Sequence, residues 1–445
     1  MAGKKTQAQL TPEEKLQQAL VPTAEQPYKV PANWCWTYLK NVSDCLDNFR
    51  KPINANERNA RFGDVPYYGA TGQVGWIDDY LTNEELVLLG EYGAPFLDLL
   101  KNKAYLINGK AWVNNHAHIL RSKFGTMGNR LLIEYLNSFD FTGFVTGTTR
   151  LKLTQASMNK IIIPLVPLAE QQRIVERIES LFAKLDEAKE NMQNVLEGFE
   201  TRKAAILHKA FTGELTAKWR KQHGVSMDTW EEKKLGDVTD ILSSKRIYKN
   251  EYVNEGIPFF RSSEIVDLYE YGYTEPKFFI SKDRYDEINK KYGVPEVGDL
   301  LVTSVGTIGK TWIVDERKFY YKDGNITQVK KNSSINMKYL NYFICSENFK
   351  KQVSDTVAGT AYNALTIIKF KNILISIPTL PEQTEIVRII DGLLAKEQQA
   401  NELSENALAK IDLIKKAILA RAFRGELGTN NPADEPAVEL LKRML

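Results

Sequence analysis

The chain has 445 residues, of which 43% are hydrophobic and 26% are charged; this composition is typical of a globular protein and this length exceeds one ordinary core. No uncharged apolar run reaches the ~18 residues of a membrane helix, and the polar start predicts no signal peptide, so we expect a cytoplasmic protein with no membrane partner. A net charge of +3 does not by itself indicate nucleic acid, and the three cysteines predict no disulfide framework.

Residues 1–27 form an N-terminal arm that contains one predicted helix. Thr11-Pro-Glu-Glu14 is a capping box with proline at the first helical position, and we expect the helix to end near Leu20. In residues 28–167, short strand-like runs alternate with turns and helical patterns. We therefore expect an α+β domain there.

Residues 168–215 predict a long helix with a coiled-coil seam. Apolar side chains recur in alternating steps of four and three, beginning with Ile174, Ile178, Leu181 and Leu185 and continuing at 188, 192, 195 and 199. Gly213, near the end of this segment, is a helix stop signal. Residues 216–227 are a linker to the next domain.

The second half of the chain has the same organisation. Residues 228–379 predict another α+β domain, 380–427 a second helix, and 428–445 a tail with a short helix at about 436–444. The seam of the second helix contains Ile386, Ile390, Leu393, Ile411 and Ile414, with Glu397 and Ser404 as interruptions.

An internal repeat explains this organisation. FTGEL at 211–215 returns as FRGEL at 423–427, and LAEQ at 168–171 returns as LPEQ at 380–383, both at an offset of 212. Two such helices in one chain can pair with each other, antiparallel, and hold two domains apart; a plain dimerisation zipper is the alternative. Because the repeat is nearly circular, we expect the two terminal helices to lie together.

This arrangement strongly resembles the specificity subunit of type I restriction-modification systems. Val65-Pro-Tyr-Tyr68 and Ile257-Pro-Phe-Phe260 also look like a segment of that family's target-recognition domains. The resemblance implies an α+β fold with a pseudo-twofold repeat, in which two mixed α/β target-recognition domains are held apart by two long antiparallel coiled-coil helices. It also implies that each domain reads one half of a split, asymmetric DNA site.

The resemblance further implies which partners and cofactors the chain uses. Double-stranded DNA, two methyltransferase subunits and two restriction or translocase subunits are the expected partners. We expect no cofactor on this chain, with S-adenosylmethionine and ATP on the partners, and no catalysis by the chain itself. The alternative function is a coiled-coil scaffold whose two globular heads bind proteins.

Two other motifs have weaker functional interpretations. Residues 304–311 nearly match a phosphate-binding loop, but Ser304 replaces the first glycine and a strand-like segment follows where a helix is needed. His116 and His118 would share a face of an extended segment, yet no third ligand completes a metal set, so we expect no metal site.

Candidate DNA contacts are side chains that can hydrogen-bond bases or phosphates and that lie near the repeated segments. In the first domain these candidates are Tyr68, Thr71, Lys110, Asn115, His116 and Arg150. In the second domain they are Arg246, Arg261, Ser262, Lys310, Tyr362 and Asn363.

Overall fold

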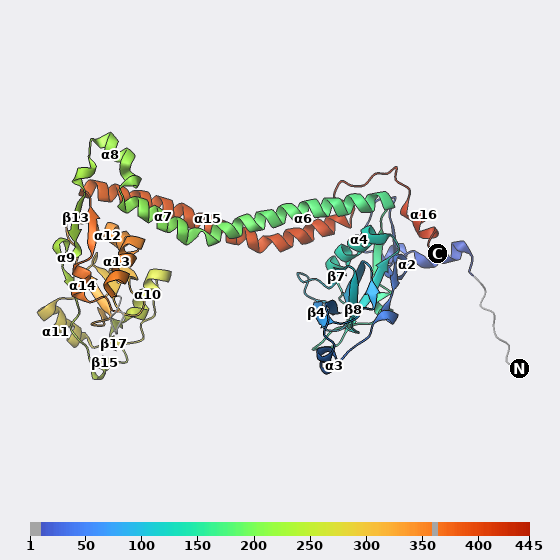
Figure 1. Ribbon diagram of the computed structural model, residues 1–445, viewed down its shortest axis with the longest axis horizontal. Helices are drawn as coiled ribbons and strands as arrows, with labels where there is room; N and C mark the ends of the chain where they lie inside the picture. Colours follow the sequence, from blue (N-terminus) through green and yellow to red (C-terminus); the bar gives the residue numbers. More distant parts are fainter. Residues whose placement is uncertain (1–9, 358–363) are drawn as a thin grey trace. The chain divides into compact units, whose positions relative to one another are not determined.

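The computed structural model describes residues 10–357 and 364–445 (Figure 1). The chain divides into two compact units, one comprising residues 1–192 and 405–445 and the other residues 193–404. Among the described helices, none is both long and apolar enough to cross a membrane.

The first unit contains two four-stranded sheets. The first sheet has the order β2–β9–β6–β7, with bounds Ser43–Cys45, Ala117–Ser122, Leu86–Gly90 and Ala104–Ile107. The second has the order β4–β3–β8–β5, with bounds Gly72–Ile77, Val65–Gly69, Lys110–Val113 and Thr82–Asn83. All neighbours are antiparallel except the parallel pair β3 and β8. Strand β6 is wholly buried because its alternate side chains enter two different cores, one of them shared with helix α4, Gly125–Ser138.

The second unit repeats the topology of the first of these sheets and part of the second. One sheet has the order β14–β21–β18–β19, with bounds Ile241–Leu242, Ile326–Val329, Leu300–Thr303 and Thr311–Ile313. The other has the order β15–β17–β16–β20, with bounds Tyr252–Val253, Phe279–Ile280, Ile257–Phe260 and Tyr320–Tyr321. The parallel pair, β16 and β20, corresponds to β3 and β8. The fourth strand differs, because β15 pairs with β17 whereas β5 pairs with β8.

Each domain is closed by a pair of strands from its two ends. The first strand β1, Cys35–Tyr38, pairs antiparallel with β12, Ile162–Leu165, and β13, Glu231–Lys234, pairs in the same way with β22, Leu374–Ile377. The beginning and end of each domain therefore meet where the following long helix starts.

The remaining elements are short. In the first unit they are α1 Pro12–Ala19, α2 Leu39–Val42, α3 Ala55–Ala60, α5 Gln155–Met158, α16 Ala437–Lys442, β10 Val145–Thr146 and β11 Lys152–Leu153. In the second unit they are α8 Ala217–His223, α9 Leu235–Val238, α10 Ser262–Tyr271, α11 Lys282–Tyr292, α12 Met337–Ile344, α13 Glu347–Val357 and α14 Ile367–Lys371.

The helix expected at 168–215 is interrupted once and ends earlier. It consists of α6, Leu168–Glu197, and α7, Phe199–Phe211, on either side of Gly198. Gly198 keeps helical backbone angles, and its N–H still donates to the carbonyl of Asn194, so the chain continues in nearly the same course. Gly213 ends the helical segment because its φ of +80° is a left-handed conformation. The second long helix, α15, is continuous from Leu380 to Ala422.

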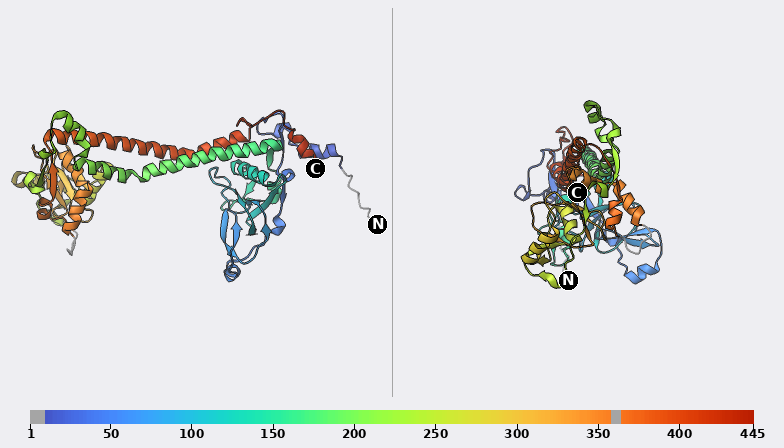
Figure 2. Two further views of the ribbon diagram at one scale, coloured as in Figure 1. Left: turned by 45° about the horizontal axis from the view of Figure 1, so that its top comes forward. Right: turned by 90° about the vertical axis from the view of Figure 1, so that its left-hand side faces the viewer.

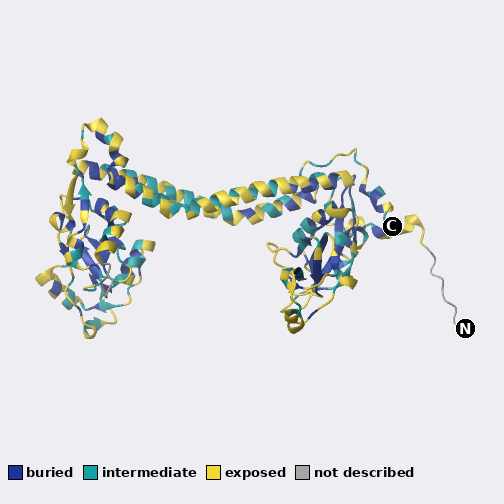
Figure 3. Cartoon of the chain, viewed as in Figure 1, coloured by how far each residue is buried: buried dark blue, intermediate teal, exposed yellow. Residues whose placement is uncertain are grey.

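The seam side chains lie on the less exposed stripe of these helices (Figure 3). Ile174, Ile178, Ile386, Ile390 and Ile411 are buried, and Leu181, Leu185 and Leu393 are half-buried. The expectation for Ile414 was wrong: its side chain is 44% exposed, whereas its neighbour Lys415 pairs with Asp186 and is the less exposed of the two.

In each unit the two helices run antiparallel. In the first unit, Lys415 of α15 forms an ion pair with Asp186 of α6, and in the second, Arg202 of α7 forms one of 2.7 Å with Glu397 of α15. A second pair in each unit gives the direction: Arg173 pairs with Asp434 in the first, and Arg220 with Glu382 in the second. Within each unit, the residue numbers of the partners therefore fall on one side as they rise on the other. Glu397, which interrupts the apolar seam, supplies the carboxylate of the pair with Arg202.

Glu170, in the LAEQ segment, is completely buried at the start of α6. Its carboxylate accepts hydrogen bonds from the indole N–H of Trp34 at 2.8 Å, the hydroxyl of Thr429 at 3.1 Å and the amide of Asn430 at 2.8 Å. Trp34 lies at the start of the first domain, directly before β1, and the other two residues follow the FRGEL segment. One side chain thus joins three parts of the chain.

Glu382, in the LPEQ segment, has the equivalent position in the second unit. It accepts from the indole of Trp230 at 3.2 Å and from the hydroxyl of Thr216 and the guanidinium of Arg220, both at 2.6 Å. Thr216 and Arg220 follow the FTGEL segment. In both copies, the repeated pentapeptide therefore lies at the end of a long helix. The residues directly after it donate hydrogen bonds to the buried glutamate at the start of the other long helix.

The two terminal helices pack against each other, as expected from the repeat (Figures 1 and 2). The ammonium of Lys15 in α1 donates to the main-chain oxygen of Leu445 at 3.1 Å, and Ala437 and Leu441 of α16 belong to the same core as Ala19. Helices α1 and α16 therefore pack onto the first unit. In the second unit, the segment after α7 has the equivalent position.

The different partners of the two glutamates give a testable difference in stability. Glu382→Gln leaves the buried guanidinium of Arg220 without its counter-charge, and we expect a loss of about 3–5 kcal/mol in the free energy of unfolding. Glu170→Gln removes only bonds from neutral donors, and we expect about 1–3 kcal/mol. Calorimetric unfolding of the full chain measures both, with the exposed Glu405→Gln as control; equal losses for Glu170 and Glu382 would contradict the charge-based explanation.

Candidate functional site

Five connecting segments of the first unit converge on one surface, and we call them the first loop set: residues 47–50, 68–71, 91–93, 114–116 and 150–153. Main-chain bonds hold them together. The N–H of Glu91 donates to the carbonyl of His116 at 2.7 Å, the N–H of Leu153 to that of Glu91 at 2.8 Å, and the N–H of Asn114 to that of Tyr68 at 3.1 Å.

The second unit has a matching second loop set: residues 243–246, 260–262, 304–309, 322–325 and 364–365. The N–H of Ser304 donates to Asn325 at 2.8 Å, that of Leu365 to Ser304 at 2.8 Å, and that of Lys322 to Phe260 at 2.8 Å. Each bond has a counterpart in the first set. The same frame is therefore built twice from different side chains.

The segment that nearly matches a phosphate-binding loop belongs to this frame. Gly306 and Gly309 both have positive φ angles, and strand β19 follows from Thr311, so no helix N-terminus is available to hold a phosphate. Gly93 has the same position and conformation in the first set, with φ +80° against +75° for Gly306. The turn is a shared structural feature of the two domains.

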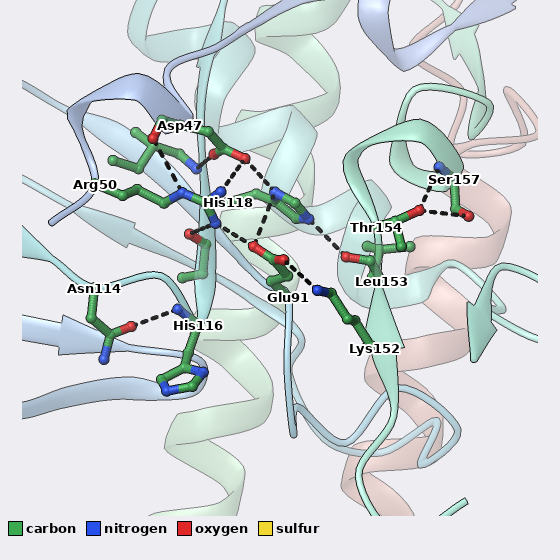
Figure 4. Close-up of polar contacts among 12 residues, drawn as sticks. Asp47, Arg50, Glu91, Asn114, His116, His118, Lys152, Leu153, Thr154 and Ser157 are labelled. Carbon is green, nitrogen blue, oxygen red and sulfur yellow. Dashed lines mark hydrogen bonds and ion pairs between the residues drawn. The ribbon is translucent and has the colours of Figure 1, made fainter. Parts of the chain in front are cut away.

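A network of charged side chains supports the first loop set (Figure 4). The guanidinium of Arg50 lies 2.9 Å from the carboxylate of Asp47, also pairs with Glu91 and donates to the carbonyl of Ala117; Lys152 lies 3.4 Å from Glu91. Burial alone would raise the pKa of the Asp47 carboxyl, but hydrogen bonds from His118 and Ile119 and the charge of Arg50 outweigh it, so this pKa is held below its usual value.

His118 belongs to this network and does not share a face with His116, contrary to the sequence interpretation. Strand β9 begins only at Ala117, after a turn in which the Asn114 side chain accepts from the N–H of His116. His118 is buried, with Nδ1 at 2.7 Å from Asp47 and Nε2 at 2.9 Å from the carbonyl of Leu153. Both neighbours are hydrogen-bond acceptors, so the imidazole ring is held between the Asp47 carboxylate and the carbonyl of Leu153.

Cys45, Asp47 and His118 lie close enough to share a metal ion, but their surroundings already satisfy them. Arg50 and His118 occupy the Asp47 carboxylate, and burial raises the pKa of the Cys45 thiol to about 11, which disfavours the thiolate that a metal requires. The chemistry of this group fits a structural polar cluster better than a metal centre.

An exposed stack of aromatic and basic side chains lies next to this charged network. The rings of Tyr92 and His116 are stacked at 5.7 Å between centroids, and the guanidinium carbon of Arg150 lies 5.8 Å from the Tyr92 ring. His116 and Arg150 are both exposed. A planar stack with cationic groups can contact phosphates and base edges.

The other first-domain candidates divide between this surface and another. Tyr68, Thr71 and Asn115 lie on the loop set. Lys110 is at the opposite end of strand β8 from residues 114–116, with its ammonium 4.9 Å from the Tyr80 ring. The structure therefore does not bring Lys110 together with the other candidates.

The second-domain candidates have more internal partners. Arg246 pairs with Asp323 at 2.7 Å, and the hydroxyl of Ser262 lies 3.4 Å from the carbonyl of Asn325. The guanidinium of Arg261 packs 4.2 Å from the Phe278 ring.

Lys310 pairs with Glu270 of α10 at 3.0 Å, which neutralises its charge. Tyr362 and Asn363 lie outside the described residues. Sequence reasoning missed Tyr92 and Asn325, because only the strand pairing in the structure shows that they lie at equivalent edges of the two domains.

The lowered pKa of Asp47 predicts a pH-dependent contribution to stability. A carboxyl whose pKa is lower in the folded than in the unfolded state stabilises the fold above its unfolded value of ~3.9, and this contribution is lost as the pH falls through the folded value. We expect Asp47→Asn to cost about 1–3 kcal/mol at pH 7, with the difference from wild type shrinking below about pH 4. Urea unfolding from pH 7 to 3 measures this, with exposed Asp44→Asn as control; a difference that persists undiminished to pH 3 would contradict it.

The sequence is similar to a known domain family and to several known proteins. The model of the type I restriction modification DNA specificity domain matches residues 32–197 and again residues 227–407. A Haemophilus influenzae protein provisionally named as a type I restriction enzyme specificity subunit is 30% identical over 83% of this chain and 89% of its own length. The EcoKI specificity subunit of Escherichia coli is 29% identical over 63% of this chain, and the match spans 61% of the EcoKI subunit.

A solved structure agrees with the fold. The HsdS subunit from Thermoanaerobacter tengcongensis matches 91% of this chain and all of its own, with a TM-score of 0.62 and 19% sequence identity. The doubled family match covers more than half of the chain, and it coincides with the two domains that carry the loop sets. The chain therefore belongs to the family of type I restriction-modification specificity subunits and contains two copies of its DNA specificity domain.

Proposed function

We propose that the chain reads a bipartite, asymmetric DNA site, one half with each loop set, and positions methyltransferase and restriction subunits on that site for N6-adenine methylation or cleavage. The observation that carries this proposal is the doubled frame: two surfaces with the same main-chain bonds but different exposed side chains. Such a pair suits two different half-sites, because phosphate contacts and geometry are common to both while base contacts differ.

The chemistry is proposed to lie on the partners. A methyltransferase must bind S-adenosylmethionine and extrude its target base, and a translocating nuclease must bind ATP. We expect both cofactors on partner subunits and no catalysis by this chain. The expected complex has two methyltransferase subunits and two restriction subunits for each specificity subunit. Because the substrate is chromosomal DNA, the cytoplasm remains the expected compartment.

Methylation sequencing tests this division of labour. The chain is expressed in a host without other adenine methyltransferases, alone and together with its methyltransferase subunit. Methylation at one split, asymmetric motif is expected only with both subunits. Methylation by the chain alone, or a methylated motif that is not split, would overturn the proposal. A scaffold for proteins, the alternative function, gains no support from the doubled DNA specificity domain.

The first loop set makes a specific prediction about salt dependence. Arg150 is exposed beside Tyr92, and if it contacts one phosphate, then Arg150→Ala reduces the slope of log affinity against log salt by about 0.9. Lys110→Ala, on the same domain but away from the loop set, is the matched control and is expected to leave the slope unchanged. Anisotropy titrations of the methyltransferase complex between 50 and 200 mM salt, as a rough range, measure both; equal effects would exclude the loop set as the DNA surface.

A further inference from the structure

Asn325 in the second unit is the structural counterpart of His116 in the first. In the first unit β6 and β9 pair Leu89 with His118 and Gly90 with Ala117; in the second, β18 and β21 pair Val302 with Thr327 and Thr303 with Ile326. The residue before each of the strands β9 and β21 is then His116 or Asn325. Both carbonyls accept the equivalent main-chain N–H, from Glu91 at 2.7 Å and from Ser304 at 2.8 Å.

The main chain at Asn325 is held in one conformation. Asn325 ends a tight turn in which Gly324 has a φ of +73°, and its carbonyl accepts from both the N–H of Ser304 and the hydroxyl of Ser262. Strand β21, which follows directly, is wholly buried. The side chain therefore projects from a fixed support, which is what base recognition requires.

The amide of Asn325 has no hydrogen-bond partner within the part of the chain that the structure describes. The side chain is partly exposed, and none of the hydrogen bonds formed among residues 10–357 and 364–445 uses its amide nitrogen or oxygen. Asn325 thus differs from Asn332 of the same unit, whose amide holds the carbonyl of Val238 and the N–H of Ser334.

The electrostatic surroundings of Asn325 suit DNA. Arg246 and Lys322 share the single carboxylate of Asp323, at 2.7 and 3.4 Å, which leaves one net positive charge beside Asn325. Asp323 is largely buried, whereas the Arg246 side chain is mostly exposed and can reach a phosphate. Among the described residues, the Asn325 amide thus lacks a partner and lies two positions from a carboxylate that binds two cations.

Resting on the proposed function, we propose that Asn325 is a specificity-determining residue that reads one base pair of the half-site bound by the second unit, at the position that His116 reads in the other half-site. In one plane, an asparagine amide can donate one of its N–H groups to N7 of adenine and accept from the N6 amino group at its oxygen, in the major groove. The base pair assigned to Asn325 is therefore A·T.

The test compares Asn325→Ala, His116→Ala and wild type, each as the full chain with its methyltransferase subunit, by sequencing of methylated genomic DNA. Asn325→Ala is expected to relax one A·T position in one half-site, lowering discrimination there by about 5- to 150-fold. The other half-site stays unchanged, and His116→Ala relaxes one position in that other half. Asn289→Ala, exposed on α11, is the control and leaves the motif unchanged.

Three outcomes would overturn the inference: an unchanged motif for Asn325→Ala, an even loss of methylation at the unchanged motif, or relaxation of the same half-site by both variants. Asn325→Ser, with melting curves for all variants, separates these outcomes from a folding defect. If wild type yields no split motif, the proposed function fails; if wild type yields one and Asn325→Ala leaves it unchanged, only this inference fails.

Discussion

A carboxylate buried at the start of each long helix is the constraint on which the rest of the structure depends. Glu170 and Glu382 are completely buried, and a buried carboxylate must be given hydrogen-bond donors or it destabilises the fold. Each collects them from the start of its own domain and from the segment that follows the other long helix. The starts of both long helices, the starts of both domains and the segments that follow the helices are therefore joined by two side chains.

The two sites use unequal chemistry for the same task. Glu170 is satisfied by an indole, a hydroxyl and an amide, all neutral, whereas Glu382 also neutralises the guanidinium of Arg220. Near each glutamate, Gln171 and Gln383 donate to the carbonyls of Val166 and Pro378, which closes the preceding strand onto the helix. The Glu-Gln pair of each repeat therefore makes two separate connections. The glutamate joins the start of its domain to the segment after the other long helix, and the glutamine joins the end of the preceding strand to its own helix.

The loop sets show how a fold can be kept while its surface changes. Their frames are made of main-chain hydrogen bonds, so the side chains can be replaced without loss of geometry. Glu91 of the first loop set and His118 of β9 correspond to Ser304 of the second loop set and Thr327 of β21. The hydroxyls of Ser304 and Thr327 lie 2.5 Å apart. An ionic network in one domain is replaced by a pair of hydroxyls in the other, and the turns above them keep their form.

The helices and the doubling were predictable from the sequence because their signals are periodic. A seam with steps of four and three extends over eight positions in α6 and α7, and its burial follows the predicted register. The domain class followed from alternating short patterns. The break at Gly198 was not predicted, because a glycine with helical angles leaves the seam intact. The exposure of Ile414 was not predicted either, because it depends on the partner helix.

The candidate surface could be predicted only in part. Its loops come together through the parallel pairing of β3 with β8 and of β16 with β20, a long-range feature that local patterns do not contain. His116 and Arg150 were identified from residue type, and the structure places both beside Tyr92. His118 was misplaced because alternation was extended back into a turn, and Lys110 because the direction of its strand was unknown.

Hydrogen exchange of the complete methyltransferase complex, with and without its DNA site, tests the central claim most directly. The claim predicts that DNA protects the main-chain amides of both loop sets, residues 91–93 and 114–116 in the first domain and 304–309 and 322–325 in the second. A DNA in which one half-site is scrambled is predicted to reduce protection in one set only. Protection confined to the long helices, or equal loss from both sets with the scrambled half-site, would contradict the account.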